Sequence, residues 1–250
     1  FFSMVKLFVT APEAVYVVFP FGMSEADQLA FDVQGGRVYP GQNQLEGTAS
    51  DWNTVQTFAA VQNPEAQILW SSVDVPLVQL GAINTGRFYY KHQPERPHIY
   101  SWVLNNYWTT NFRASQEGEM KWTYTITSAA NTTRSFATRF GWENKVPLLG
   151  RVIPANQAVG ETAPAVRSLL NFDTPNLLLV NARPVTDKRG VLLHLRETEG
   201  NPVVLDTGTL LNQTGMGVAY EVNVLGEVQR RLSKSLRIED YETKFVLLVH

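Results

Sequence analysis

The stretch MKWTYTITS, residues 120–128, decides the fold class because its apolar and polar side chains alternate. The side chains at every second position are apolar, and those between them are Lys or Thr; the apolar set is Met120, Trp122, Tyr124 and Ile126. A period of two is typical of a β-strand that buries one of its faces. The stretch therefore predicts a half-buried strand of an antiparallel sheet.

Similar strand patterns occur on both sides of this stretch. Residues 13–21, EAVYVVFPF, are rich in β-branched and aromatic side chains and run into Pro20 and Gly22. Towards the end of the chain, strands are expected at 191–197, 202–208, 217–227 and 241–249. Short strands separated by turn residues are typical of antiparallel sandwiches. We therefore expect an all-β protein.

One short helix is expected over residues 131–142. Asn131 is suited to the N-cap position, Phe136 and Phe140 share one face, and Gly141 is a suitable stop. This helix is the only departure from the strand pattern that the sequence predicts.

A segment rich in proline and glycine, residues 146–164, follows the expected helix. Such a change in composition is typical of a connection between domains. The sequence therefore predicts two domains, a large β-sandwich region at 1–165 and a small antiparallel β-sandwich at 166–250.

The composition excludes several classes of function. Lys and Arg total 21 against 23 for Asp and Glu, without a basic stripe, so nucleic acid is not an expected partner. Cysteine is absent, which excludes disulfides and thiolate ligands. No stretch approaches the ~20 consecutive apolar residues of a membrane span. The first residues, FFSMVKLFVT, do not resemble a signal peptide, and we expect the chain to belong inside a longer, soluble protein.

The sequence offers little for a metal site. The histidines are His92, His98, His194 and His250, and a zinc site of His92 and His98 with Glu95 is conceivable. Two loop histidines without a metal are the interpretation we favour, because proline residues hold this segment in an extended or turning conformation. We therefore predict no metal ligand in this chain.

Glycoside hydrolysis requires two carboxylates about 5–9.5 Å apart. Glu46, Asp51 and Asp74 are candidates, but the sequence does not bring any two of them together. Asp32 lies in a turn context and receives no role. Neither a G-x-S-x-G nucleophile elbow nor a glycine-rich phosphate loop is present. We therefore predict no catalytic residue.

The run YSWVLNNYWTTNF, residues 100–112, has the composition of a carbohydrate contact, because amides can bind hydroxyl groups and aromatic rings can stack on sugar C–H groups. Alternatively, the adjacent asparagines mark a bulge or turn. Asp51 beside Trp52 has the same two interpretations, a sugar contact or an Asx-turn before a core tryptophan. The candidate carbohydrate-binding residues are Asn105, Asn106, Tyr107, Trp108, Asn111, Asp51 and Trp52.

Several segments resemble one known family. SWVLNNYWTTNFRASQEGE, residues 101–119, resembles part of the C-terminal β region of bacterial proteins of glycoside hydrolase family 38, the α-mannosidase family. AVYVVFPF, NQLEGTASDWNTVQ and VPLVQLG resemble other segments of that region in the same order, and TPNLLLVNARPV with RGVLLHLRETEGN resembles its final small sandwich. The resemblance covers nearly the whole chain. It implies a galactose-mutarotase-like large β-sandwich, here partial, followed by a small one.

The same resemblance implies a function without catalysis. In that family the catalytic aspartate and the zinc ligands belong to an N-terminal barrel, which this chain does not resemble. We therefore expect a C-terminal β region that packs on the missing barrel, lines the cleft for an α-mannoside, and is inactive alone. The parent would be a bacterial enzyme of mannose metabolism, cytoplasmic or exported, with zinc in its missing domain and no cofactor here. The alternative is a stand-alone carbohydrate-binding module; no His and Glu arrangement around His98 favours an epimerase or lyase.

Overall fold

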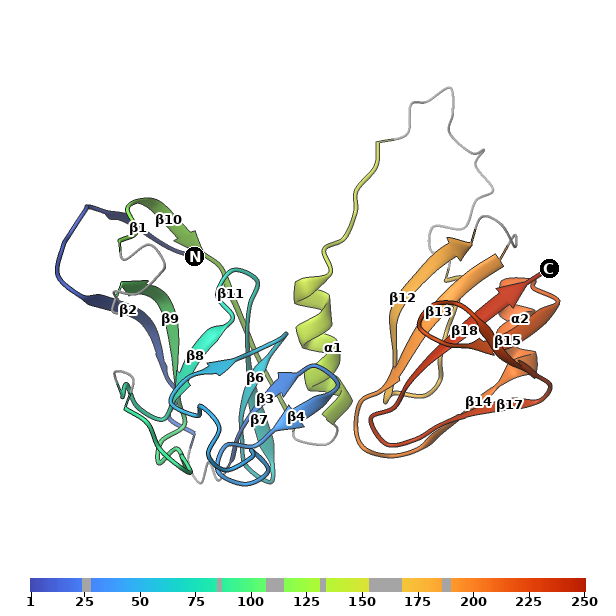
Figure 1. Ribbon diagram of the computed structural model, residues 1–250, viewed down its shortest axis with the longest axis horizontal. Coiled ribbons are helices and arrows are strands. Elements are labelled where there is room, and N and C mark those ends of the chain that lie inside the picture. Colours follow the sequence, from blue (N-terminus) through green and yellow to red (C-terminus); the bar gives the residue numbers. More distant parts are fainter. Residues whose placement is uncertain (24–27, 85–86, 107–114, 131–133, 153–167, 186–189) are drawn as a thin grey trace. The chain divides into compact units, whose positions relative to one another are not determined.

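The computed structural model describes residues 1–23, 28–84, 87–106, 115–130, 134–152, 168–185 and 190–250. The chain divides into two compact units, Phe1–Val146 and Pro147–His250. The boundary expected near residue 165 lies outside the described residues. Antiparallel sheets account for most of the regular secondary structure of the described chain (Figure 1), which confirms the expected all-β class.

Two sheets form most of the first unit. One has four strands in the order β2-β9-β8-β5, which are β2 (Glu13–Pro20), β9 (His98–Asn106), β8 (Leu77–Leu80) and β5 (Asn53–Thr54). The other has five strands in the order β11-β7-β6-β3-β4, which are β11 (Tyr124–Ala130), β7 (Ala66–Ser72), β6 (Ala59–Gln62), β3 (Gln28–Val33) and β4 (Gly36–Val38). We call them the four-stranded and the five-stranded sheet.

The core of the first unit lies between these two sheets. The four-stranded sheet contributes Phe19, Val78, Leu80 and Ile99, and the five-stranded sheet contributes Leu29, Phe31, Val61 and Trp70. The Trp70 ring meets the rings of Phe19 at 5.9 Å and of Tyr124 at 5.6 Å. Each such large side chain contributes roughly 1.5–3 kcal/mol on burial. The two sheets are therefore the layers of a sandwich.

The strand expected at 120–128 is interrupted in the structure. Residues up to Trp122 form β10 (Gly118–Trp122), which pairs with β1 (Phe2–Lys6), whereas β11 begins at Tyr124 and pairs with β7. The N–H group of Thr123 donates to Asp74 Oδ2 at 2.7 Å. Because the Thr123 N–H group bonds to a side chain, it does not donate to a neighbouring strand. The hydrogen bonding between strands is therefore interrupted at Thr123, and the chain passes from the pair β1–β10 to the five-stranded sheet.

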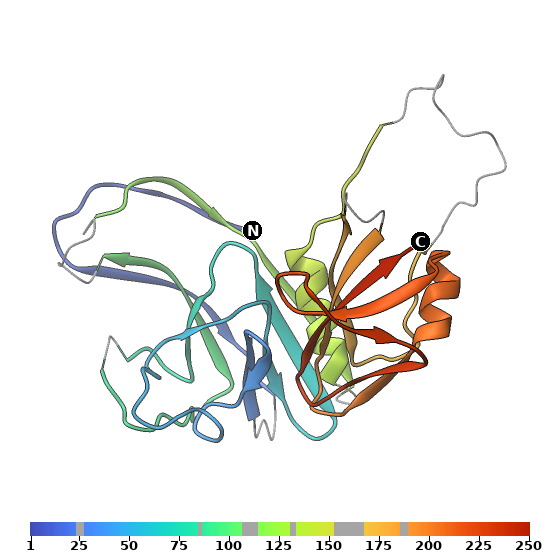
Figure 2. The ribbon, with the colours of Figure 1, turned by 45° about the vertical axis from the view of Figure 1, so that its right-hand side comes forward.

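Helix α1 (Arg134–Lys145) covers the outer face of the five-stranded sheet (Figures 1 and 2), where Ala137 and Phe140 pack on a cluster that includes Phe58. The predicted stop at Gly141 is wrong, because the helix continues through it. A Cβ atom at this glycine would meet the side chain of Thr57, so the glycine permits close approach of helix and sheet. Phe136 is exposed and does not share the packed face; the predicted cap, Asn131, lies outside the described residues.

A buried carboxylate fixes the connection between the two sheets. Asp32 on β3 accepts hydrogen bonds from the N–H groups of Thr57 (2.7 Å) and Phe58 (2.9 Å), and from the Thr57 hydroxyl. The expectation that Asp32 has no special role is therefore wrong. The bonded residues lie between β5 of one sheet and β6 of the other. Asp32 thus holds the segment in which the chain crosses the sandwich.

The second unit is a smaller sandwich. Its main sheet has the order β12-β13-β18-β15-β16, made of β12 (Leu177–Val185), β13 (Gly190–Glu197), β18 (Thr243–Val249), β15 (Val218–Val222) and β16 (Val228–Leu232). One face packs on the pair β14 (Val203–Asp206) and β17 (Ser235–Ile238) and on helix α2 (Thr207–Thr214), with Leu193, Leu210, Leu236 and Leu248 at the centre.

The described residues contain two helices, so the expectation of one is wrong. The strand expected at 202–208 ends at Asp206, whose carboxylate accepts from Thr209 N–H at 2.6 Å and caps α2. Gly215 ends the helix in the left-handed conformation. As far as the described residues go, neither helix combines the length and hydropathy needed to cross a membrane.

The carboxylate of Glu197 organises one end of the second unit. It is fully buried and accepts from Asn176 Nδ2 and from the N–H groups of Glu199, Gly200 and Tyr241, at 2.7–2.8 Å. Burial by itself raises the pKa of Glu197, but the hydrogen bonds outweigh it and hold the pKa below its ordinary value. These hydrogen bonds connect the end of β13 to the residue before β12, to the turn at Glu199 and Gly200, and to the turn at Tyr241.

We expect Asp32→Ala to lower the free energy of unfolding by about 3–5 kcal/mol, because it leaves buried N–H and hydroxyl donors without an acceptor. The matched control is Asp74→Ala, which removes one hydrogen-bond acceptor near the surface. This variant should lower the free energy of unfolding by about 1 kcal/mol. Urea denaturation measures both. Equal losses in the two variants would contradict the role given to Asp32.

The lowered pKa of Glu197 predicts a pH dependence of stability. A carboxylate with a depressed native pKa stabilises the fold above its unfolded pKa, about 4.3, and this contribution is lost as the pH falls through the native pKa. In Glu197→Gln the loss of stability below about pH 4.5 should be shallower than in the wild type, with a residual slope from Glu221 and Glu242, whose pKa values are also lowered. Denaturant titrations across this range measure the slopes. A slope in Glu197→Gln equal to that of the wild type would contradict this role of the carboxylate.

Candidate functional site

A β-bulge lies in the strand that carries the paired asparagines. Val15 pairs with Leu104, but Tyr16 pairs with Trp102, so Val103 is an extra residue on β9. A bulge of this kind turns the residues beyond it relative to those before it. It decides which way Asn105 and Asn106 face.

The two asparagines face opposite sides of the four-stranded sheet. Asn105 pairs with Ala14, two residues from Tyr16, and so belongs to the outer face. Asn106 pairs with Glu13 and lies on the core side, where it is 3% exposed. Its Nδ2 group has no hydrogen-bond partner in the part of the chain that the structure describes. The pair therefore does not form one continuous polar patch.

Three aromatic rings form a row across the outer face of this sheet. Tyr16 of β2 stacks on Trp102 of β9, with ring centroids 5.5 Å apart and planes at 21°. Trp52, next to β5, meets Trp102 edge to face at 5.8 Å. Trp102 is buried, whereas Tyr16 and Trp52 are half-buried. We call Tyr16, Trp102 and Trp52 the aromatic row.

An amide lies on the same face, on the strand between the two tryptophans. Gln79 of β8 pairs with Tyr100, which shares a face with Trp102. Gln79 Nε2 donates to Asn84 Oδ1 at 2.6 Å, and Asn84 Nδ2 donates to the carbonyl oxygen of Asp51 at 3.0 Å. The two amides thus connect the sheet to the loop that carries Asp51 and Trp52.

Polar atoms of this face are buried without a partner among the described residues. They are Tyr16 Oη, Trp102 Nε1 and Gln79 Oε1. An unsatisfied buried polar group costs about 1–3 kcal/mol, so such groups call for a water or a ligand. Burial raises the pKa of Tyr16 to about 12, so the phenol keeps its proton at neutral pH. The face therefore offers two donors and one acceptor beside aromatic rings.

The structure places four of the seven predicted carbohydrate-binding residues. Trp52 belongs to the aromatic row, and Asp51 next to it in the chain is buried. Asn105 lies on the same face of the sheet as the aromatic row, and Asn106 does not. The other three, Tyr107, Trp108 and Asn111, lie outside the described residues.

Three further residues of this face, Tyr16, Gln79 and Asn84, are not among those predicted from the sequence. Alternation in β2 could have placed Tyr16 on the face opposite the core residue Phe19. No sequence signal marks Gln79 or Asn84, because their roles depend on pairing between distant strands.

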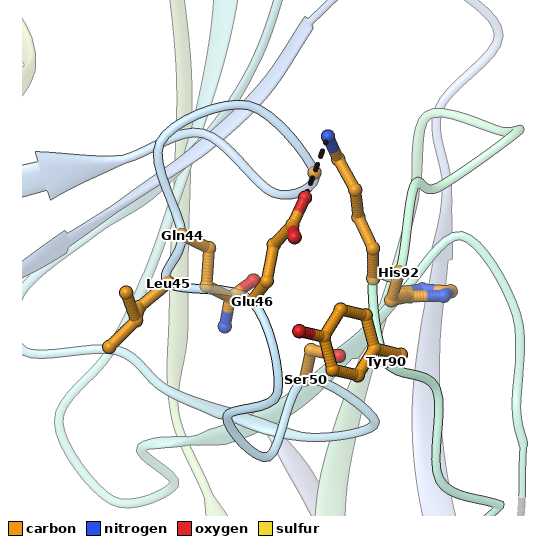
Figure 3. Close-up of a pocket in the computed structure, with 8 residues that line it drawn as sticks. Gln44, Leu45, Glu46, Ser50, Tyr90 and His92 are labelled. Atoms are coloured by element: carbon orange, nitrogen blue, oxygen red, sulfur yellow. Dashed lines mark ion pairs between the residues drawn. The ribbon is translucent and has the colours of Figure 1, made fainter.

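The residues considered for metal binding or hydrolysis are engaged separately. His92 Nε2 lies 3.1 Å from the carbonyl oxygen of Leu80, and His98 Nδ1 lies 3.3 Å from Tyr100 Oη. Glu46 pairs with Lys91 at 3.4 Å, as the dashed line in Figure 3 shows. Within the described ranges, no group of three His, Asp or Glu side chains could hold a metal ion. The arrangement can bind polar groups.

The fold and this face together define a class, that of all-β proteins in which a large sandwich precedes a small one. No protein-family model matches the sequence, and no curated protein matches it. Solved structures do match: an α-mannosidase from Enterococcus faecalis V583 is similar over 95% of this chain, with a TM-score of 0.68 and 14% identity. A protein of glycosyl hydrolase family 38 from Enterococcus faecalis is similar over 95% of the chain, with a TM-score of 0.62 and 12% identity.

These similarities concern the fold. The chain spans 26% of the length of each of the two structures, so it has the fold of about a quarter of a family 38 α-mannosidase structure. The similarity of the folded chain agrees with the fold that the resemblance of the sequence segments implies.

Removal of the Tyr16 hydroxyl tests whether it is unpartnered. Because Tyr16→Phe deletes a buried polar atom without a described partner, the free energy of unfolding should stay the same or rise by up to about 1 kcal/mol. The matched control, Tyr124→Phe, removes the hydrogen bond from Tyr124 Oη to Ser101 Oγ (3.0 Å). This variant should lower the free energy of unfolding by about 1 kcal/mol. Urea denaturation compares the two. A clear loss of stability in Tyr16→Phe would show that the hydroxyl has a partner.

Proposed function

We propose that this chain is a non-catalytic β region of a family 38-type, α-mannosidase-like glycoside hydrolase. The observation that carries the proposal is the similarity of the fold over 95% of this chain to structures of which it spans 26%. In this proposal the rest of the parent protein supplies the zinc ion and the catalytic carboxylates. The residues of this chain bind and orient the substrate and exclude water from it.

Exposed apolar residues near the start of the chain support packing against another domain. Val5, Leu7 and Phe8 are 72%, 75% and 62% exposed, on β1 and the segment after it. Contiguous exposed apolar side chains are typical of interfaces. A catalytic barrel that covers them would remove this apolar surface from water.

The aromatic row supports contact with a carbohydrate. Trp52 and Tyr16 are half-buried and so keep part of their ring surface accessible, and the unsatisfied groups of Tyr16, Trp102 and Gln79 could exchange hydrogen bonds with hydroxyl groups. Rings and amides that converge in this way suit an α-mannoside in a cleft between this face and the catalytic domain.

The isolated 250-residue chain should not hydrolyse an aryl α-mannoside, with or without added zinc. The reason is that its described residues hold no group of side chains that could bind a metal ion, and that in this proposal the catalytic carboxylates belong to the rest of the parent protein. Release of the aryl group, followed by absorbance, measures this, with the Enterococcus faecalis α-mannosidase as positive control. Turnover by the purified chain would overturn the proposal.

The second candidate function is a stand-alone carbohydrate-binding module, and the aromatic row is the observation that favours it. Such a module would bind mannose oligosaccharides through Trp52 and Trp102 without a catalytic domain. A change in tryptophan fluorescence on titration with these sugars, lost in Trp52→Ala, would favour the module. An unchanged signal would favour a face that needs the catalytic domain to complete its cleft.

A further inference from the structure

A pocket of about 520 Å³ lies in the loop between β8 and β9, and none of the residues of the aromatic row lines it. Its walls include Tyr89, Lys91, Gln93, Pro94, Glu95 and Arg96. The volume falls within the range of about 300–1,000 Å³ that is typical of small-molecule sites. The pocket is therefore large enough for a ligand of the size of a sugar ring.

Backbone hydrogen bonds hold the two ends of this loop together. Gly81 N–H donates to the carbonyl oxygen of His98 at 2.9 Å, and His92 Nε2 lies 3.1 Å from the carbonyl oxygen of Leu80. Gly81 has a positive φ of 82°, and a Cβ atom there would lie 2.8 Å from Pro94 Cβ. The close approach of the loop's two arms therefore requires glycine.

A second loop supports the first from outside. Gly47 N–H donates to the carbonyl oxygen of Tyr90 at 2.9 Å, and Ser50 Oγ donates to that of Tyr89 at 3.3 Å. The ion pair between Glu46 and Lys91 joins the same two loops (Figure 3). Because the carbonyl groups of Tyr89 and Tyr90 are already bonded, this part of the loop is held in place before a ligand arrives, which reduces the entropy lost on binding.

Three polar side chains of the pocket remain available. Gln93, Glu95 and Arg96 have no hydrogen-bond or ion-pair partner among the described residues, while Lys91 is neutralised by Glu46. The guanidinium group supplies a fork of donors, the carboxylate supplies acceptors, and the amide supplies both. Tyr89 and Pro94 add apolar walls.

The charges of these groups decide the class of ligand. Glu95 and Arg96 balance each other, so an anion would meet the carboxylate and a cation would meet the guanidinium group. An apolar ligand would bury their charges without partners, at high cost. A neutral ring with adjacent hydroxyl groups can accept from Arg96, donate to Glu95 and lay its C–H groups on Tyr89 or Pro94.

We infer that this pocket is a carbohydrate subsite that binds one neutral sugar ring, separate from the aromatic row. The choice of a sugar as the ligand rests on the proposed function, and the location of the binding site rests on the pocket. It assigns Arg96 and Glu95 to the hydroxyl groups of the sugar and Tyr89 to its C–H face.

The test is binding of methyl α-mannoside to the full chain, measured by saturation-transfer difference NMR and by titration calorimetry. Arg96→Ala and Glu95→Ala should each weaken binding at least about tenfold, because each removes a charged hydrogen-bond partner. Lys145→Ala, a partly exposed cation on α1, should leave the affinity unchanged, while Trp52→Phe reports whether the sugar binds at the aromatic row instead. Thermal unfolding of every variant checks that it is folded. Mannose 6-phosphate should bind more weakly than the neutral glycoside.

The outcomes separate this inference from the proposed function. Absence of binding, or binding that survives both Arg96→Ala and Glu95→Ala, overturns the subsite. Binding lost only in Trp52→Phe moves the sugar to the aromatic row, which overturns the subsite and leaves the proposed function intact. Turnover of an aryl mannoside by the chain overturns the proposed function without affecting the measured location of binding.

Discussion

The buried carboxylate of Asp32 is the interaction on which the first unit depends most. It binds the backbone of Thr57 and Phe58 in the segment that leaves one sheet of the sandwich and enters the other. Phe58 then lies under helix α1, where Gly141 allows the helix to approach. A single acceptor on β3 therefore fixes the connection between the sheets and the position of the helix that covers one of them.

The candidate site follows from this constraint. Asp51 and Trp52 lie just before β5, the strand that leads into the crossing segment, so a fixed crossing helps to fix where Trp52 meets Trp102. Gln79 and Asn84 then attach the Asp51 loop to β8. The same loop region, through Gly47 and Ser50, supports the pocket between β8 and β9. The sugar-facing features proposed here are thus held by backbone and amide hydrogen bonds on one sheet and its two loops.

Features that depend on a local residue pattern, such as most strands, could be predicted from the sequence. Features that depend on contacts between residues far apart in the chain could not. Strands such as β2 and β18 were predicted because β-branched and aromatic residues dominate them. Helix α2 was missed, although Asp206 three residues before Thr209 is a capping signal. The break at Thr123 depends on Asp74, far away in the chain, and the meeting of Trp52 with Trp102 depends on strand pairing. No local pattern contains such pairings.

The chain shares its fold with part of an α-mannosidase structure, and it carries a face and a pocket that we propose bind sugars. We propose that the chain serves a larger enzyme. The most direct measurement is the coding sequence immediately upstream of the codon for Phe1. The account predicts an open reading frame that continues into a catalytic domain with aspartate and histidine zinc ligands. A start codon adjacent to Phe1, with no such domain encoded, would contradict it.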